Sequence, residues 1–323
     1  MVKIDIISGF LGAGKTTLIK KLLKDGFQGE QVVLIENEFG EIGIDGGFLK
    51  EAGIQIREMN SGCICCSLVG DFGTSLKEVV TKYDPYRILI EPSGVGKLSD
   101  VIKAVQGVQD EVDIKLNSYT TVVDAKKCKM YMKNFGEFFD NQIQYAGAII
   151  MSRTDIASEK KVQESLELLR SLNKDAAIIT TPIENLDGKK LVEVMEHPVS
   201  LEQEMLEEEH EHHHHHDGEC GCGHDHHHHH ADEVFTSWGR ETIKKYTREG
   251  LEKILEALSE SDKYGIILRA KGMLPAEDGT WIYFDMVPEE TEIREGAPEY
   301  TGRLCVIGSK LDEHALEELF GIA

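Results

Sequence analysis

Short apolar runs alternate with segments of helical periodicity along the first 180 residues. The runs are brief and rich in Val and Ile, so we expect buried strands at 4–7, 32–37, 86–94, 120–124, 146–151 and 176–180. The segments between them repeat apolar residues at helical spacing, most clearly at Leu18, Ile19, Leu22 and Leu23, and at Val162, Leu166, Leu169 and Leu172. This alternation predicts an α/β domain with a doubly wound, mostly parallel sheet, ending near Pro198.

The pattern changes twice after that point. Residues 199–233 have no apolar periodicity, so we expect a linker that is disordered without metal. From residue 234 to residue 323 the pattern resumes as a smaller α+β domain. Its strands are expected at 234–238, 264–272, 281–287 and 303–309. An amphipathic helix is expected at 241–259, and a closing helix from about Asp312.

Charge and composition narrow the class of protein. The chain has 323 residues and a net charge of −23, which argues against nucleic acid or an anionic membrane as a partner. It contains no apolar run of about 18 residues, so we expect no membrane span. The first strand begins at residue 2, so we expect no signal peptide and a cytoplasmic location.

The segment GFLGAGKTT lies between the first strand and the first helix. Gly9, Gly14, Lys15 and Thr16 satisfy the pattern GxxxxGK(S/T) of a phosphate-binding loop. Lys15 is expected to reach the outer phosphates, and the Thr16 hydroxyl to hold Mg²⁺. The alternative is a chance glycine-rich turn. The expected nucleotide-binding residues are Gly12, Ala13, Gly14, Lys15, Thr16 and Thr17.

Acidic residues and a second motif follow later strands. Glu36, Glu38 and Glu41 are candidate metal ligands, although they could equally form a solvated acidic loop. Glu91 ends a strand where a Walker B acid stands, and Gly94 is placed to offer an N–H to the γ-phosphate.

The tetrapeptide SRTD, residues 152–155, occupies the position where guanine-reading proteins often carry NKxD. Asp155 is expected to accept the guanine N–H donors, and Arg153 to stack in place of the lysine.

Seven cysteines are present, and three of them are Cys63, Cys65 and Cys66 in GCICCSL. Thiolates at this spacing favour Zn²⁺, Cu(I) or similar ions, with a fourth ligand from water, a glutamate or another protein. Buried small hydrophobes and a redox dithiol are the alternatives. Cys305 is expected in the core, and Cys128 and His314 as structural or surface residues.

The linker is dense in metal-binding side chains and holds eleven Asp and Glu but no Lys or Arg between residues 201 and 233. We expect it to bind Zn²⁺, Ni²⁺, Co²⁺ or Cu²⁺. A purification tag is one alternative, although the interleaved CGCGHD argues against it; a merely polar linker is another. The expected ligands are His210, His212, His213, His214, His215, His216, Cys220, Cys222, His224, His226, His227, His228, His229 and His230.

Five segments resemble, in their order along the chain, the CobW-like family of metal-handling P-loop GTPases. They are GFLGAGKTTL, ENEFGEIGID, GCICCSL, IEPSG and LRAKG. The resemblance covers both domains. It implies a phosphate loop at residues 12–17, a metal site at the three cysteines between two switch regions, and base reading by Asp155. Family members are described as metal-chaperoning or metal-inserting GTPases, many linked to zinc and others to cobalt or nitrile hydratase. The chain departs from the family in carrying SRTD for NKxD, and Pro92 where Thr is usual.

These features predict a GTP-hydrolysing metallochaperone that uses GTP and Mg²⁺ and passes Zn²⁺, or else Co²⁺ or Ni²⁺, to a client metalloprotein. Lys15, Thr16 and Glu91 are the expected catalytic residues, with Glu36 and Glu41 as candidates for positioning the water. A metal-storage or metal-sensing protein with little turnover, a cobalt or nickel insertion accessory protein and a small-molecule kinase are the alternatives. The sequence leaves open whether the protein forms a homodimer.

Overall fold

A computed structural model describes residues 1–36, 55–58, 69–109, 111–198, 236–287 and 290–322. The chain divides into two compact units, Met1–Pro198 and Val199–Ala323. Four groups of predicted site residues lie outside the described residues: Glu38, Glu41, the cysteines Cys63, Cys65 and Cys66, and the His/Cys-rich segment 199–233.

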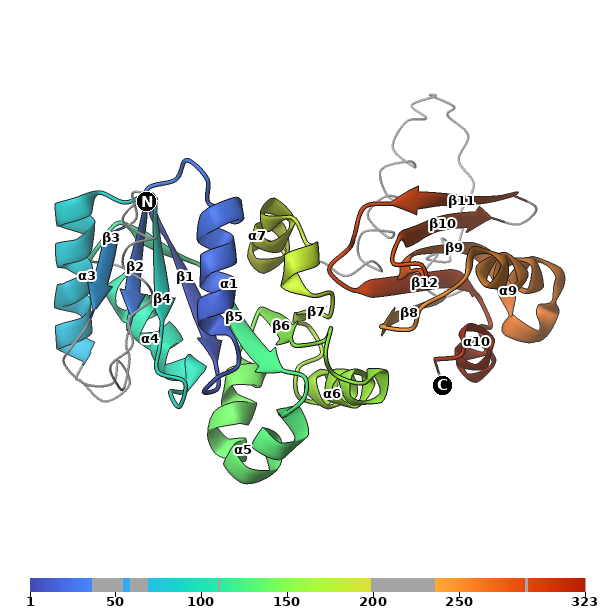
Figure 1. The fold of residues 1–323 in the computed structure, drawn as a ribbon, viewed down its shortest axis with the longest axis horizontal. Coiled ribbons are helices and arrows are strands. Elements are labelled where there is room, and N and C mark those ends of the chain that lie inside the picture. Colours follow the sequence, from blue (N-terminus) through green and yellow to red (C-terminus); the bar gives the residue numbers. More distant parts are fainter. Residues whose placement is uncertain (37–54, 59–68, 110, 199–235, 288–289, 323) are drawn as a thin grey trace, which may run out of the picture. The chain divides into compact units, whose positions relative to one another are not determined.

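The first unit is built on a parallel sheet. Among the described residues it has seven strands in the order β3-β2-β4-β1-β5-β6-β7, and each neighbouring pair is parallel. The doubly wound fold predicted from the sequence is thereby confirmed (Figure 1). The strands are β1 (Val2–Gly9), β2 (Val32–Glu36), β3 (Gln55–Glu58), β4 (Arg87–Glu91), β5 (Ile114–Asp124), β6 (Ala148–Ser152) and β7 (Ala177–Ile179).

Helices cover both faces of this sheet, which explains its continuous apolar runs. Every residue of β2 and β4 is buried, as parallel strands packed on both sides require. The α-helices of the unit are α1 (Lys15–Lys21), α3 (Val69–Tyr83), α4 (Leu98–Val108), α5 (Cys128–Gln144), α6 (Glu159–Leu172) and α7 (Gly188–Glu196). A short 3₁₀ turn, η2 (Ile183–Asn185), precedes α7.

The first predicted helix is an α-helix in its first half and a π-helical turn in its second. The α-helix ends at Lys21, and the apolar stripe continues through a π-helical turn, η1 (Leu22–Gly26). The Phe27 N–H bonds the Leu22 carbonyl at 2.8 Å, which is the wider spacing of such a turn. Gly26 lies against Gly188 of α7, where a Cβ on Gly188 would fall 2.6 Å from the Gly26 nitrogen. The turn thus lets α7 pack closely against the end of the first helix.

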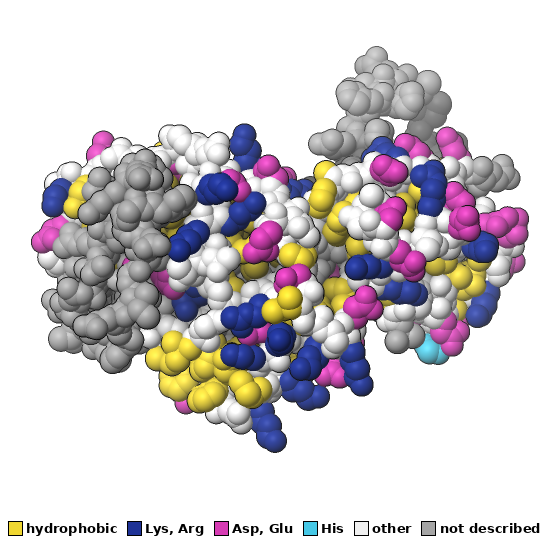
Figure 2. Space-filling view, in the orientation of Figure 1, with side chains coloured by type: hydrophobic (Ala, Val, Ile, Leu, Met, Phe, Trp, Pro, Cys, Tyr) yellow, Lys and Arg dark blue, Asp and Glu magenta, His cyan; other side chains and the backbone are white. Residues whose placement is uncertain are grey.

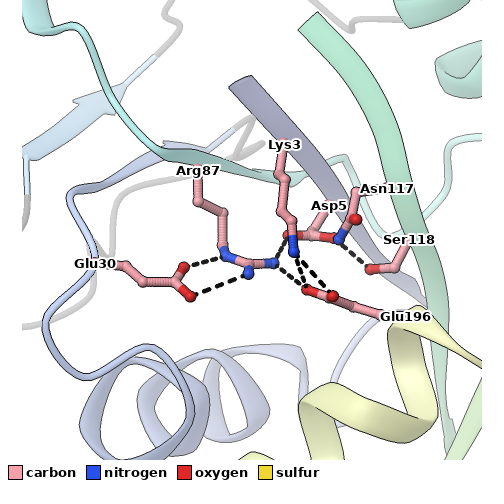
Figure 3. Close-up of polar contacts among 7 residues, drawn as sticks. All are labelled: Lys3, Asp5, Glu30, Arg87, Asn117, Ser118 and Glu196. Atoms are coloured by element: carbon pink, nitrogen blue, oxygen red, sulfur yellow. Dashed lines mark hydrogen bonds and ion pairs between the residues drawn. The ribbon is translucent and has the colours of Figure 1, made fainter. Parts of the chain in front are cut away.

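A buried polar network ties α7 to the amino ends of the strands (Figure 3). The Arg87 guanidinium pairs with Asp5, with Glu30 at 2.6 Å and with Glu196, the last residue of α7, at 2.9 Å. Burial by itself lowers the pKa of Arg87. Hydrogen bonds to Glu30 and the charge of Asp5 outweigh that effect and raise it above its ordinary value. Lys3 donates to Glu196 as well, at 3.0 Å, so the network fixes where the chain leaves this unit.

The second unit is an antiparallel sheet with two α-helices among its described residues. Its strand order is β11-β10-β9-β12-β8, and the neighbouring strands run antiparallel. Its elements are β8 (Thr236–Thr242), α9 (Arg248–Glu260), η4 (Asp262–Tyr264), β9 (Ile266–Pro275), β10 (Trp281–Val287), β11 (Glu290–Gly296), β12 (Gly302–Ser309) and α10 (Glu313–Phe320). The α+β class predicted for this region is confirmed.

One helix boundary was predicted wrongly. The helix expected from residue 241 begins at Arg248, because β8 runs on to Thr242 and pairs there with Gly302 of β12. The helix start is set by Thr247, whose side chain accepts a hydrogen bond from the Gly250 N–H at 3.0 Å. Two strands, β3 and β11, were also missed by the sequence analysis. Both lie at a sheet edge.

Candidate functional site

The phosphate loop joins β1 to α1 at the carboxyl edge of the sheet. Gly9, Gly12 and Gly14 have φ values of 144°, 69° and 106°, in the left-handed region that favours glycine. At Gly9 a Cβ would lie 2.5 Å from the Val122 carbonyl oxygen, so β5 also excludes a side chain there. Gly14 precedes the first residue of α1, so the loop ends where the helix presents its free N–H groups.

The Lys15 ammonium is held over this loop by two buried groups. Its Nζ donates to the Gly9 carbonyl at 3.1 Å and lies 3.7 Å from Glu91 Oε1. Glu91 ends β4 and pairs in register with Glu36 at the end of β2, and both carboxylates are buried. The structure therefore brings Lys15, Glu91 and Glu36 to one edge of the sheet.

The SRTD segment is tied to the phosphate loop. The Ser152 hydroxyl donates to the Ala13 carbonyl at 2.6 Å, and the Arg153 guanidinium donates to the Gly12 carbonyl at 3.0 Å. Arg153 also pairs with the buried Asp124 carboxylate at the end of β5. Through its N–H groups the guanidinium therefore ties this segment to the loop and to Asp124. Its stacking on a base stays a prediction. Asp155 is exposed beyond this anchored pair.

The loop after β4 lies directly against the phosphate loop. A Cβ on Gly94 would fall 3.0 Å from the Leu11 nitrogen and 2.9 Å from the Leu11 side chain. Gly94 is buried, whereas Val95 at the tip of the loop is exposed. The residue predicted to meet the outer phosphate is thus in contact with the loop predicted to hold it.

An aromatic cluster packs α5 against the phosphate loop. The Phe10 ring lies 4.6 Å from the Tyr131 ring and 5.1 Å from the Phe135 ring, measured between centroids. Figure 2 shows hydrophobic side chains gathered on the surface over α5. Phe135 and Leu11 are exposed by 46% and 56%. An exposed apolar surface therefore borders the predicted nucleotide site.

The predicted metal ligands lie outside the described residues, in the cysteine motif and in the His/Cys-rich segment. Within the described part of the chain, no group of three or more His, Cys, Asp and Glu is placed to hold a metal ion. Cys128 and Cys305 are buried free thiols, and burial raises the pKa of Cys128 to about 11. Both described cysteines are thus packed as core residues, which the sequence analysis expected for Cys305, whereas for Cys128 it left a structural or a surface role open.

The sequence analysis missed two residues of this site. Asp124 ends a strand as Glu91 does, so its position alone could have marked it. Gln142 lies in the last turn of α5, and its amide donates to the carbonyls of Gly94 and Gly96 at 3.2 Å and 2.8 Å. No local sequence signal marks Gln142, because its partners are more than forty residues away.

The site combines a parallel sheet with a phosphate loop shaped by glycines, a lysine bound to that loop and acidic residues at the ends of strands. These features define a P-loop nucleotide-binding protein. A sequence model described as "CobW/HypB/UreG, nucleotide-binding domain" matches residues 3–180, and one described as "Cobalamin synthesis protein cobW C-terminal domain" matches residues 235–322. The chain belongs to the CobW/HypB/UreG family.

Two named relatives align with this chain over different fractions of its length. The protein is 29% identical over 191 residues to the zinc chaperone YeiR of Escherichia coli, covering 59% of this chain and 58% of that relative. This match therefore spans little more than half of YeiR. It is 24% identical over 333 residues to the zinc-regulated GTPase metalloprotein activator 1 of Schizosaccharomyces pombe, covering 90% of this chain and 76% of that protein.

A solved structure resembles the chain more weakly. The Zn(II)-bound YjiA GTPase from E. coli is 20% identical, with a TM-score of 0.45 over 99% of this chain and 98% of that one. A TM-score below 0.5 does not by itself establish a shared fold. No described helix of the present structure is long and apolar enough to cross a membrane.

Proposed function

We propose that this protein is a GTP-hydrolysing metallochaperone that binds a transition metal, zinc foremost, at Cys63, Cys65 and Cys66 and passes it to a client protein. Support comes from family membership, from relatives named as a zinc chaperone and as a zinc-regulated GTPase metalloprotein activator, and from the cysteine motif. The described residues add a further argument, because β3, the strand that precedes the cysteine motif, ends at the same edge of the sheet as the phosphate loop.

The nucleotide end of this proposal rests on Lys15. Its ammonium is buried beside Glu91 and is held over the phosphate loop by the Gly9 carbonyl. A triphosphate would meet this cation together with the free N–H groups at the start of α1. We assign the base to Asp155, next to Arg153 and Ser152, which are anchored on the loop.

The residues present also suit Mg²⁺. Thr16 is in the first turn of α1, and Glu91 and Glu36 place two buried carboxylates at the adjacent strand ends. Oxygen donors of this kind are those that Mg²⁺ prefers. Bound there, Mg²⁺ would neutralise the charge that develops on the transferred phosphoryl group.

The single observation that carries nucleotide control of the metal is the position of β3. Its last residue, Glu58, pairs in register with Glu36, which in turn pairs with Glu91 beside Lys15. Cys63 follows Glu58 by five residues. Strand β3 therefore ends at the carboxyl edge of the sheet, where the phosphate loop also lies, five residues before the cysteine motif in sequence.

Hydrolysis tests the enzymatic part. We expect GTP turnover by the purified protein to change when Zn²⁺ is added, and Lys15→Ala to abolish turnover in both conditions. A double variant, Cys65→Ser and Cys66→Ser, should still hydrolyse GTP but lose the response to Zn²⁺, because a hydroxyl is a poor zinc ligand. Turnover that is negligible with and without zinc would favour a storage protein. Phosphate transfer to a small acceptor would favour a kinase.

A further inference from the structure

One helix holds both ends of the segment that follows Glu91. Gln142 of α5 is completely buried, and its Nε2 donates to the carbonyls of Gly94 and Gly96. Asn141, the preceding residue, accepts a hydrogen bond from the Ser99 N–H at 3.2 Å and donates to the Ser99 hydroxyl at 3.0 Å. Residues 94–99 are therefore held on α5 by two adjacent amide side chains.

The other side of this segment meets the phosphate loop. A Cβ on Gly94 would lie 2.9 Å from the Leu11 side chain and 3.0 Å from the Leu11 nitrogen, so the two loops are in close contact. The same helix reaches Leu11 directly, through the Tyr131 hydroxyl, which donates to the Leu11 carbonyl at 3.4 Å. Helix α5 thus contacts the phosphate loop through Tyr131 and the Gly94 loop through Gln142.

The Gln142 amide is the only described side chain that donates a hydrogen bond to the carbonyls of Gly94 and Gly96. Gly94, Gly96 and Gln142 are all buried, so water is poorly placed to replace these bonds. Without them, the loop would keep its contact with Leu11 but lose the bonds that orient its backbone. Backbone orientation is what decides whether an N–H group at Gly94 points to a γ-phosphate.

We propose that Gln142 is a positioning residue that orients the Gly94 loop for the γ-phosphate and so makes the protein distinguish GTP from GDP. This inference rests on the proposed function, since it takes GTP as the nucleotide. Gln142 acts through the Gly94 backbone and touches neither the base nor the α- and β-phosphates. Its removal should therefore weaken binding of the triphosphate and spare the diphosphate.

The test compares affinities for GDP and for a non-hydrolysable GTP analogue by calorimetry. Gln142→Met keeps the size of the side chain and removes its donors. We expect it to lower affinity for the analogue about tenfold, the effect of losing two hydrogen bonds, with GDP affinity unchanged. Gln142→Asn keeps an amide that is one methylene shorter, so it should give an intermediate loss. This second variant preserves the test if Gln142→Met does not fold.

Asn173 offers a matched control. It is also a buried amide. Its Nδ2 donates to the carbonyls of Ile143, in the last turn of α5, and of Ala146, just beyond that helix, each at 2.8 Å. Asn173→Leu should lower the melting temperature without altering the ratio of the two nucleotide affinities. The proposal is overturned if the Gln142 variants lose affinity for both nucleotides equally, or if Asn173→Leu changes the ratio as much. Failure of the unsubstituted protein to bind the analogue would instead refute the proposed function.

Discussion

The Ser152 hydroxyl donates a hydrogen bond to the Ala13 carbonyl at 2.6 Å, and so joins the first residue of the SRTD segment to the phosphate loop. Ser152→Ala removes this bond and should weaken binding of GTP and GDP alike by about fivefold, as the loss of about 1 kcal/mol implies. Calorimetric titration of both nucleotides measures this. Unchanged affinities would show that the bond does not support the site. Ser152→Asn, which restores the residue of NKxD, should retain binding.

Base choice should depend on Asp155. Its carboxylate is exposed next to the anchored Arg153, where it can accept both N–H donors of guanine. We expect the protein to prefer GTP over ATP, and Asp155→Ala to remove that preference while ATP affinity stays the same. Competition between the two nucleotides for a fluorescent GDP analogue provides the measurement. Asp175, an exposed acid beyond α6, gives a control as Asp175→Ala. Tighter binding of ATP than of GTP to the unsubstituted protein would contradict this assignment.

The pH dependence of stability should report on Glu196. Burial raises the pKa of this carboxyl, but hydrogen bonds from Lys3, Asn117 and Arg87 outweigh it and lower the pKa below 4.5. The folded state therefore favours ionised Glu196. Its contribution is full above about pH 4.5 and is lost as the pH falls through the lowered pKa.

Glu196→Gln should lower the free energy of unfolding by about 1–3 kcal/mol at pH 7. It should also make that free energy depend less on pH below pH 4.5. Urea unfolding at several pH values tests this. Glu193→Gln serves as the control. Glu193 is on the same helix, but its side chain is 65% exposed, and its ion pair with Lys190 is a surface pair with a separation of 3.7 Å. Equal effects of the two substitutions would mean that the buried network does not stabilise the unit.

The phosphate loop and its strands could be predicted because their signals are local. Gly9, Gly14 and Lys15 stand in a fixed spacing after an apolar run, and that run is buried on both faces in β1. The missed strands carry little apolar signal: β3 reads QIRE and β11 reads ETEIREG, each with one strongly apolar residue. Both are edge strands, which need to bury less surface than central ones.

Contacts between distant residues set the parts of the fold and site that could not be predicted. The β8 strand extends through Glu241 because Arg303, more than sixty residues later, pairs with it. Gln142 joins the site through carbonyls that any residue at positions 94 and 96 would offer, so its sequence neighbourhood says nothing of its role. The roles of the cysteines and the His-rich segment stay predictions from residue type and spacing.

Nucleotide control of the cysteine site is the central claim, and zinc titration tests it most directly. The protein should first be stripped of metal and deleted for residues 210–230, so that only the cysteine motif competes for zinc. Zinc affinity is then measured with GDP and with a non-hydrolysable GTP analogue. Coupling between binding sites predicts affinities that differ by roughly 5- to 150-fold, and a Cys65→Ser, Cys66→Ser variant should bind weakly in both states. Equal zinc affinity in the two nucleotide states of the parent protein would contradict the account.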